Sequence, residues 1–119
     1  MRGFRGLAVW QKAHALTLAV YRVTATFPPA ERFGLTQQLR RASVSVGSNI
    51  AEACGRGSEA DFRRCIHIAP GSANETDYQL LLARDLDMLP SDTYVALATP
   101  CTEVERMLVS LIKRAHPIP

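Results

Sequence analysis

Arginines are the residues of this chain whose type and placement best suit a chemical role. A guanidinium group binds phosphate well because its planar fork donates two hydrogen bonds to one anion. Residues 1–64 carry ten Lys or Arg against four Asp or Glu, a net charge of +6, whereas residues 65–119 carry four against seven, a net charge of −3. The basic half includes a group around one predicted helix and the turn after it: Arg40, Arg41, Arg56, Arg63 and Arg64. This distribution predicts an acidic partner such as RNA or DNA, and the alternative is a solvated basic face.

Aromatic side chains, on which bases could stack, are sparse near these arginines. Trp10, Tyr21 and Tyr78 are the candidates for exposed stacking platforms, whereas Phe62 falls on an apolar stripe. We therefore expect any contact with nucleic acid to be mainly with its backbone, sensitive to salt and weakly selective for sequence.

Motifs for catalysis and for cofactors are missing from the sequence. None of the six glutamates precedes a histidine by three residues, as a di-iron bundle requires. His14, His67 and His116 stand in no nucleophile motif, and Gly55-Arg56-Gly57-Ser58 lacks the lysine and the preceding strand of a phosphate-binding loop. We expect a protein that is not an enzyme, with no catalytic residue and no cofactor.

Cysteine spacing argues against a metal centre. Cys54, Cys65 and Cys101 form no CxxC pair, and Cys65 and His67, two residues apart, face different sides of a helix. We expect no metal ion and three free thiols that serve as small core residues.

Glu75 lies beside an apolar stripe in the middle of a predicted helix. A buried carboxylate needs a partner, which Arg40, Arg41 or Arg56 could supply. A structural ion pair is therefore the favoured interpretation of Glu75, and a functional role is the alternative.

The length of 119 residues and mass of 13.1 kDa fit one domain, residues 1–119, with a single core. No apolar run approaches the ~18 residues of a membrane span. Gln11, Lys12 and His14 interrupt what would have to be the apolar part of a signal peptide. We expect a cytoplasmic protein that has no membrane partner.

Apolar residues recur at alternating spacings of three and four, which is typical of amphipathic helices. The pattern predicts helices over about residues 5–27, 36–53, 58–88 and from 91 or 92 toward the C-terminus. Four helical segments joined by short connections, without strand-like alternation, predict an all-α antiparallel up-and-down four-helix bundle.

Two prolines fall inside these patterns. Proline lacks the amide hydrogen of a helix interior, so we expect a bend at Pro70 with the third helix continuing through it. Pro100 interrupts the last pattern, which therefore forms either one helix or two shorter ones.

Small residues recur four apart on the second predicted helix, at Ser43, Gly47 and Ala51. They allow another helix to approach closely, or they leave surface for a neighbouring subunit together with Leu81 and Leu82.

Several short motifs together resemble the four-helix bundle family encoded in bacterial 23S rRNA intervening sequences. The matching segments are residues 7–13, 21, 27–28, 31–36, 38–42, 48–52, 55–56, 61–62, 68–69, 71–72, 75 and 79–80. The chain departs from the family pattern at Ala53-Cys54, at Pro70 and at Asp87, which stands where a glycine is common.

The resemblance implies a homopentameric ring of antiparallel bundles without enzymatic activity. Relatives include the accessory variability protein of diversity-generating retroelements, which binds nucleic acid and a reverse transcriptase. The resemblance also marks motif residues with a structural or functional role: Asn49, Glu52, Gly55, Arg56, Ser72, Glu75 and Gln79.

The residues and the resemblance together lead to one functional expectation and one alternative. We expect an oligomer that binds RNA or DNA through a basic surface repeated around the ring. The alternative is a scaffolding oligomer that binds a partner protein, such as a reverse transcriptase, and uses its arginines for ion pairs between subunits.

Overall fold

Helices make up almost all of the computed structural model, which describes residues 3–115, with side chains for residues 3–114. Its five α-helices are α1 (Ala8–Thr24), α2 (Leu35–Cys54), α3 (Glu59–Ile66), α4 (Ala69–Asp85) and α5 (Ser91–Ala115). Two short 3₁₀ turns, η1 (Phe4–Gly6) and η2 (Pro29–Glu31), precede α1 and α2. Residues 3–115 contain no strand, so the all-α prediction is confirmed.

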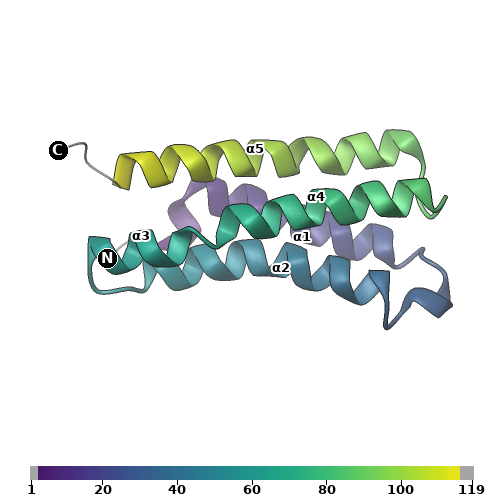
Figure 1. The fold of residues 1–119 in the computed structure, drawn as a ribbon, viewed down its shortest axis with the longest axis horizontal. Helices are drawn as coiled ribbons and strands as arrows, with labels where there is room; N and C mark the ends of the chain where they lie inside the picture. The colour runs from purple at the N-terminus through teal and green to yellow at the C-terminus, as the bar shows by residue number, and fades with distance from the viewer. Residues whose placement is uncertain (1–2, 116–119) are drawn as a thin grey trace.

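The helices lie side by side along the longest axis of a molecule that measures 49 × 22 × 20 Å (Figure 1). Helix α1 packs against α2 and α5, and α4 packs against the same two helices. The short helix α3 packs mainly against α2 and takes up the end of the column that α4 begins (Figure 1). The five helices therefore form four helical columns, and the buried side chains between them make two hydrophobic clusters along the long axis.

The predicted apolar stripes face the buried interior between these columns. All six positions of the α2 stripe are buried: Leu35, Leu39, Ala42, Val46, Ile50 and Ala53. The stripe that runs through α3 and α4 is buried as well: Phe62, Ile66, Ala69, Ala73, Thr76, Leu80 and Ala83. Burying each large apolar side chain contributes about 1.5–3 kcal/mol, so these stripes hold the columns together.

The prediction of one continuous third helix through Pro70 is wrong. Helix α3 ends at Ile66, residues 67–68 form a turn, and α4 begins at Ala69. Pro70 cannot donate to the Ile66 carbonyl, and its ring would clash with that carbonyl in a continuous helix. At the second position of α4 the missing amide costs nothing, because first-turn amides have no partner within the helix. The start of the predicted helix is confirmed, since Ser58 Oγ accepts from the Asp61 amide at 3.2 Å.

Pro100, in contrast, lies inside the single helix α5, so the alternative of two shorter helices is wrong. Leu97, Cys101 and Val104 on both sides of it are buried in the core. Tertiary packing therefore keeps α5 continuous despite the lost hydrogen bond.

The first helix is shorter than the predicted range of 5–27. Helix α1 ends at Thr24, and the amides of Thr26 and Phe27 bond to carbonyls three residues back at 3.1 Å, as in a tight turn. This turn still buries Phe27 before Pro28 starts the connection to α2. Helix α2 extends the predicted range by one residue at each end.

Helix α4 ends in a left-handed residue. Asp87 has φ 59°, and the Met88 amide bonds to the Ala83 carbonyl at 2.9 Å, which closes the last turn. This backbone conformation favours glycine, which explains why the family pattern commonly has glycine where this chain has Asp87.

Candidate nucleic-acid interface

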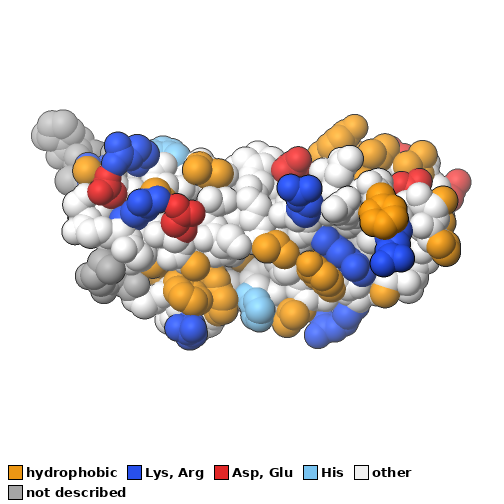
Figure 2. All heavy atoms as spheres, turned by 90° about the horizontal axis from the view of Figure 1, so that it is seen from below, with side chains coloured by type: hydrophobic (Ala, Val, Ile, Leu, Met, Phe, Trp, Pro, Cys, Tyr) orange, Lys and Arg blue, Asp and Glu red, His pale blue; other side chains and the backbone are white. Residues whose placement is uncertain are grey.

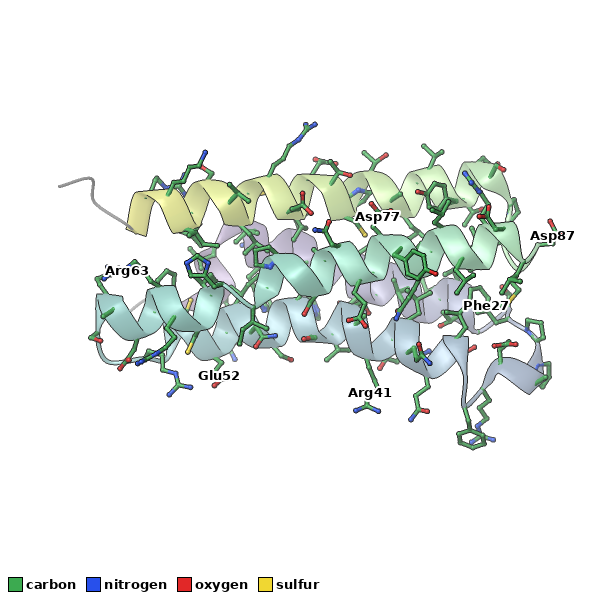
Figure 3. The ribbon with its side chains drawn as sticks, in the orientation of Figure 1. Phe27, Arg41, Glu52, Arg63, Asp77 and Asp87 are labelled. Carbon is green, nitrogen blue, oxygen red and sulfur yellow. The ribbon has the colours of Figure 1, made fainter. Side chains whose placement is uncertain are left out.

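The five arginines expected to form one basic cluster occupy two separate regions. Arg40 and Arg41 lie in the middle of α2, whereas Arg56 follows its C-terminal end and Arg63 and Arg64 lie on α3 (Figure 3). Arg41 and Arg56 are 15 positions apart in the chain. At 1.5 Å per residue this is on the order of 22 Å along the helix axis.

In the first region, the Arg40 side chain is held in place by α1. Its Nε donates to Thr24 Oγ1 at 2.8 Å, and its guanidinium carbon lies 4.6 Å from the centre of the Tyr21 ring. Thr24 is 3% exposed, and its hydroxyl donates in turn to the Val20 carbonyl at 2.7 Å. Arg40 is therefore fixed at the surface of α1 and α2 without an acidic partner.

Two more arginines flank this fixed guanidinium. Arg22 follows Tyr21 on α1 and Arg41 follows Arg40 on α2, and both are exposed. Within residues 3–114, neither forms an ion pair or a side-chain hydrogen bond, and Arg40 forms no ion pair either. We call Arg22, Arg40 and Arg41 the arginine band. Figure 2 shows Lys and Arg side chains across the right-hand half of this face, with few Asp or Glu side chains between them.

Sequence reasoning missed Arg22 because it stands alone in the printed chain. The signal that could have found it is its neighbour Tyr21, which had been considered as a stacking platform. The structure instead places Arg40 over that ring, across the contact between α1 and α2, and Arg22 is the residue that follows Tyr21 on α1.

The second region is locally neutralised. Arg56 Nη2 donates to Glu52 Oε1 at 2.6 Å, and Arg56 Nε donates to Cys65 Sγ at 3.1 Å. The contact with Cys65, and then that with Glu52, raises the pKa of Arg56. Arg64 forms an ion pair with Asp61 one turn earlier on α3. These arginines thus present less free positive charge than the arginine band.

The motif residues also divide between the two regions. Glu52 and Gly55 lie at the end of α2 beside Arg56, whereas the others line the contact between α2 and α4: Asn49, Ser72, Glu75 and Gln79. Asn49 Nδ2 donates to Ser45 Oγ at 2.9 Å, and this hydroxyl lies 2.9 Å from Ser72 Oγ. The chain of hydrogen bonds fixes the register of α2 against α4.

A polar groove of about 440 Å³ opens at one end of this contact. It is lined by residues of both helices: Gln38, Arg41, Ala42, Ser45 and Glu75. We call it the α2–α4 groove. The predicted ion pair of Glu75 with Arg40, Arg41 or Arg56 is wrong, because within residues 3–114 the Glu75 carboxylate pairs with none of them and is exposed at the edge of this groove. Among the described residues, its carboxylate contacts only Gln79 Nε2, at 3.5 Å.

Gln79 is the unusual member of this group. It is 6% exposed, and its Oε1 is buried without a hydrogen-bond partner among the described residues. Exchanging the amide oxygen and nitrogen would place two acceptors together at Glu75, so the stated orientation is the favourable one. Gln79 Oε1 therefore lacks a hydrogen-bond donor, and the neighbouring Glu75 carboxylate forms no ion pair within residues 3–114.

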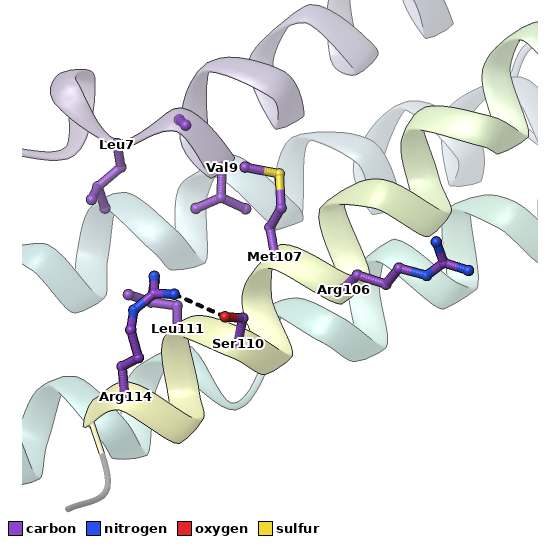
Figure 4. A pocket seen from close by; sticks show the side chains of 8 residues that line it. Leu7, Val9, Arg106, Met107, Ser110, Leu111 and Arg114 are labelled. Atoms are coloured by element: carbon purple, nitrogen blue, oxygen red, sulfur yellow. Dashed lines mark hydrogen bonds between the residues drawn. The ribbon is translucent and has the colours of Figure 1, made fainter.

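A second hollow, of about 320 Å³, lies between the start of α1 and the end of α5 (Figure 4). Leu7, Val9 and Met107 give it an apolar floor, and Arg114 Nη1 donates to Ser110 Oγ at 2.8 Å at its rim. No histidine or carboxylate lines this hollow. It therefore offers shape and positive charge without a general acid or base.

The thiols differ in their surroundings. Within residues 3–114 the three cysteines form no disulfide, and Cys54 and Cys101 are buried as predicted, whereas Cys65 is half-buried and faces Arg56. Burial, and then the charge of Asp77, raises the pKa of Cys101 to about 12.

In the part of the chain that the structure describes, no three His, Cys, Asp or Glu side chains come together as a metal site would need. Among those same residues, no helix combines the length and the apolar character needed to cross a membrane.

Comparison with known proteins places the chain in a family. A search of curated proteins found no match. A crystal structure of a protein of unknown function from the S23 ribosomal protein family, from Bacteroides thetaiotaomicron, superposes with a TM-score of 0.80 at 29% sequence identity. The match covers 89% of this chain and 99% of that one. The family model described as 23S rRNA-intervening sequence protein matches residues 5–110. The chain therefore belongs to the 23S rRNA-intervening sequence protein family.

Proposed function

We propose that this protein is a non-enzymatic oligomer that binds RNA or DNA through the arginine band, in the bacterial cytoplasm. The observation that carries the proposal is the fixed position of Arg40 over Tyr21, together with the exposed and unpaired Arg22 and Arg41, which follow Tyr21 and Arg40 in the chain. A guanidinium that is already ordered loses little conformational entropy when it binds phosphate.

The proposed subunit is an antiparallel up-and-down four-helix bundle, and the proposed assembly is a homopentamer. Connections at alternating ends of the long axis support the first (Figure 1), and the family resemblance supports the second. Five copies, each with a formal net charge of +3, would sum to about +15. Repetition of the arginine band around a ring would strengthen weak single contacts through multivalency.

The five arginines predicted from the sequence keep different places in this proposal. Arg40 and Arg41 belong to the arginine band, and Arg22 joins them. Arg56 and Arg64 hold ion pairs with Glu52 and Asp61, so their proposed role in binding phosphate is secondary. Arg63 lies beside Arg64 on α3, in the same region, and its proposed role is secondary as well.

Fluorescence anisotropy tests the proposal. Labelled structured RNA, single-stranded DNA and duplex DNA are titrated with the protein across a salt series, and light scattering gives the mass of the same preparation. We expect the logarithm of the affinity to fall linearly with the logarithm of the salt concentration. The absence of binding to all three probes at low salt would overturn the proposal, and a monomeric mass would overturn the ring.

An apolar groove favours the alternative function, a scaffold that binds a partner protein. The groove has a volume of about 340 Å³ and lies between α1 and α2, where Trp10 stacks on His14 with ring centres 5.0 Å apart. Val44 is exposed at its edge. A Ser48→Glu variant distinguishes the two functions, because Ser48 is exposed, lines this groove and lies seven residues beyond Arg41 on α2, so the new charge stands away from the arginine band. A smaller mass with unchanged RNA binding would support a protein interface here, whereas an unchanged mass would argue against it.

A further inference from the structure

Glu75 gives the α2–α4 groove a feature that binding to phosphate does not explain. We propose that this groove binds an unpaired guanine base, with Glu75 accepting from the base edge, Tyr78 stacking on its face and Arg41 contacting an adjacent phosphate. The inference rests on the proposed function, since it names the base that the same surface recognises.

The carboxylate of Glu75 selects for hydrogen-bond donors. An ionised carboxylate only accepts hydrogen bonds, and it repels phosphate. Glu75 lines the same groove as Arg41, yet the two form no ion pair, so both groups are available to a ligand. A nucleic acid that follows the arginine band must therefore present donors at this point.

Guanine is the base that offers two adjacent donors. Its N1–H and its 2-amino group lie side by side on the Watson–Crick edge and match the two oxygens of one carboxylate. Adenine and cytosine each place a ring acceptor next to their amino group, and uracil flanks its single N–H with carbonyl oxygens. A carboxylate therefore binds guanine with two hydrogen bonds and meets an acceptor on each other base.

Tyr78 supplies the flat surface that an unpaired base needs. It is 61% exposed and lies three residues after Glu75 on α4, a spacing that makes the two side chains neighbours on the helix surface. The other candidate platforms are covered, since Arg40 lies over Tyr21 and His14 stacks on Trp10. Tyr78 has no such partner among the described residues. Stacking on an exposed tyrosine is the common way in which proteins hold unpaired bases.

Gln79 positions the carboxylate that would hold the base. Its Nε2 lies 3.5 Å from Glu75 Oε2, and its own Oε1 is buried. Glu75 Oε1 accepts no hydrogen bond within residues 3–114, so the edge of the carboxylate is open to the donors of a base. The groove, with about 440 Å³, has room for a purine ring.

The test uses labelled ten-nucleotide strands of adenosine that carry one central guanosine, inosine or adenosine, each made as RNA and as DNA. We expect the guanosine strand to bind at least ~5-fold more tightly than the all-adenosine strand, the lower bound for one good bidentate contact. Inosine lacks the 2-amino group and should lose most of this preference. The RNA and DNA arms show which backbone carries the base, and unlabelled GMP, as a competitor, shows whether the free nucleotide suffices.

Two variants assign the preference to its residues. Glu75→Gln should reduce the guanosine preference to less than ~2-fold, because it replaces one of the two accepting oxygens with an NH2 group, which donates and would face a donor of guanine. Glu105→Gln on α5 removes the same charge away from the groove and should leave the preference unchanged. Tyr78→Ala should weaken binding of all three strands by about 5-fold or more.

The failure of this inference differs from the failure of the proposed function. Equal, salt-sensitive binding of all strands would overturn the guanine site and leave the proposed function standing. If no strand binds at low salt, the proposed function fails, and binding of labelled GMP then decides the inference. If GMP binds and Glu75→Gln abolishes that binding, the guanine site stands. If GMP does not bind, the guanine site is overturned.

Discussion

Arg40 is expected to stabilise the fold as well as to bind phosphate, and the two roles can be separated. Its Nε bonds to Thr24 Oγ1, a group that is 3% exposed, and its guanidinium lies over Tyr21. A hydrogen bond from a charged donor contributes about 1–1.5 kcal/mol in such a half-buried place, and the ring contact adds about 0.5–1 kcal/mol. We therefore predict that Arg40→Ala lowers the free energy of unfolding by about 2 kcal/mol.

Urea unfolding followed by far-UV circular dichroism, at one fixed protein concentration, measures this loss. Arg41→Ala is the matched control, because it removes the same charge from the next residue of α2, where the side chain is exposed and makes no hydrogen bond to residues 3–114. It should change the free energy of unfolding by less than about 0.5 kcal/mol. Equal stability of the two variants would refute the claim that α1 holds Arg40 in place.

Three further predictions concern the fold. Gly47→Ala should raise the free energy of unfolding, measured in urea, by about 0.5–1 kcal/mol, because alanine favours a helix more than glycine does. The added Cβ would lie in ordinary contact, 3.4 Å from Trp10 Nε1. A loss of stability would show that α1 does not shift to accommodate the added methyl group. Asp87→Gly should raise the free energy of unfolding by a net of about 0.5–1 kcal/mol, and with it the melting temperature, because φ 59° suits glycine. A lower melting temperature would contradict the strain at Asp87. The pKa of Cys101, raised to about 12 by burial and then by Asp77, exceeds that of the unfolded thiol, so the folded state keeps the proton longer. The free energy of unfolding should therefore fall by up to about 1.4 kcal/mol per pH unit between pH 9 and 12, and Cys101→Ala, measured over the same pH range, should lack this slope.

The sequence predicted the helices and their inner faces well because a spacing of three and four residues depends on local geometry alone. The two proline positions had different outcomes for a non-local reason. Pro70 falls where a new helix can start, whereas Pro100 is held in α5 by the buried residues around it. A local rule about proline cannot distinguish these two environments.

Small residues on α2 illustrate the same division. Their spacing predicted close approach by another helix, and the structure identifies α1 as that helix, with Trp10 against Gly47 and Thr17 Oγ1 bonded to the Ser43 carbonyl at 3.0 Å. Ser43 and Gly47 therefore pack against α1, while Gly47 and Ala51 also line the apolar groove between α1 and α2. The expectation that this side leaves surface for a neighbouring subunit stays a prediction.

The candidate site was less accessible to sequence reasoning. Arginines that are near one another in the printed chain proved to be spread along α2 and α3, and the ones beside acidic residues pair with them. Arg22 joins the site only through the contact of Arg40 with Tyr21 between α1 and α2, which no spacing within one segment reveals. The wrong interpretation of Glu75 has a similar origin, because the sequence pattern does not decide whether a residue at the edge of an apolar stripe faces the core or the solvent.

The salt dependence of binding in two charge-matched variants tests the central claim most directly. Arg22→Ala/Arg41→Ala removes two unpaired charges of the arginine band, and Arg56→Ala/Arg64→Ala removes two charges that are paired with Glu52 and Asp61. With single-stranded RNA, we predict that the slope of log affinity against log salt becomes shallower by about 1.4 in the first variant and hardly changes in the second. Equal slopes in both variants and the wild type would contradict the assignment of phosphate binding to the arginine band.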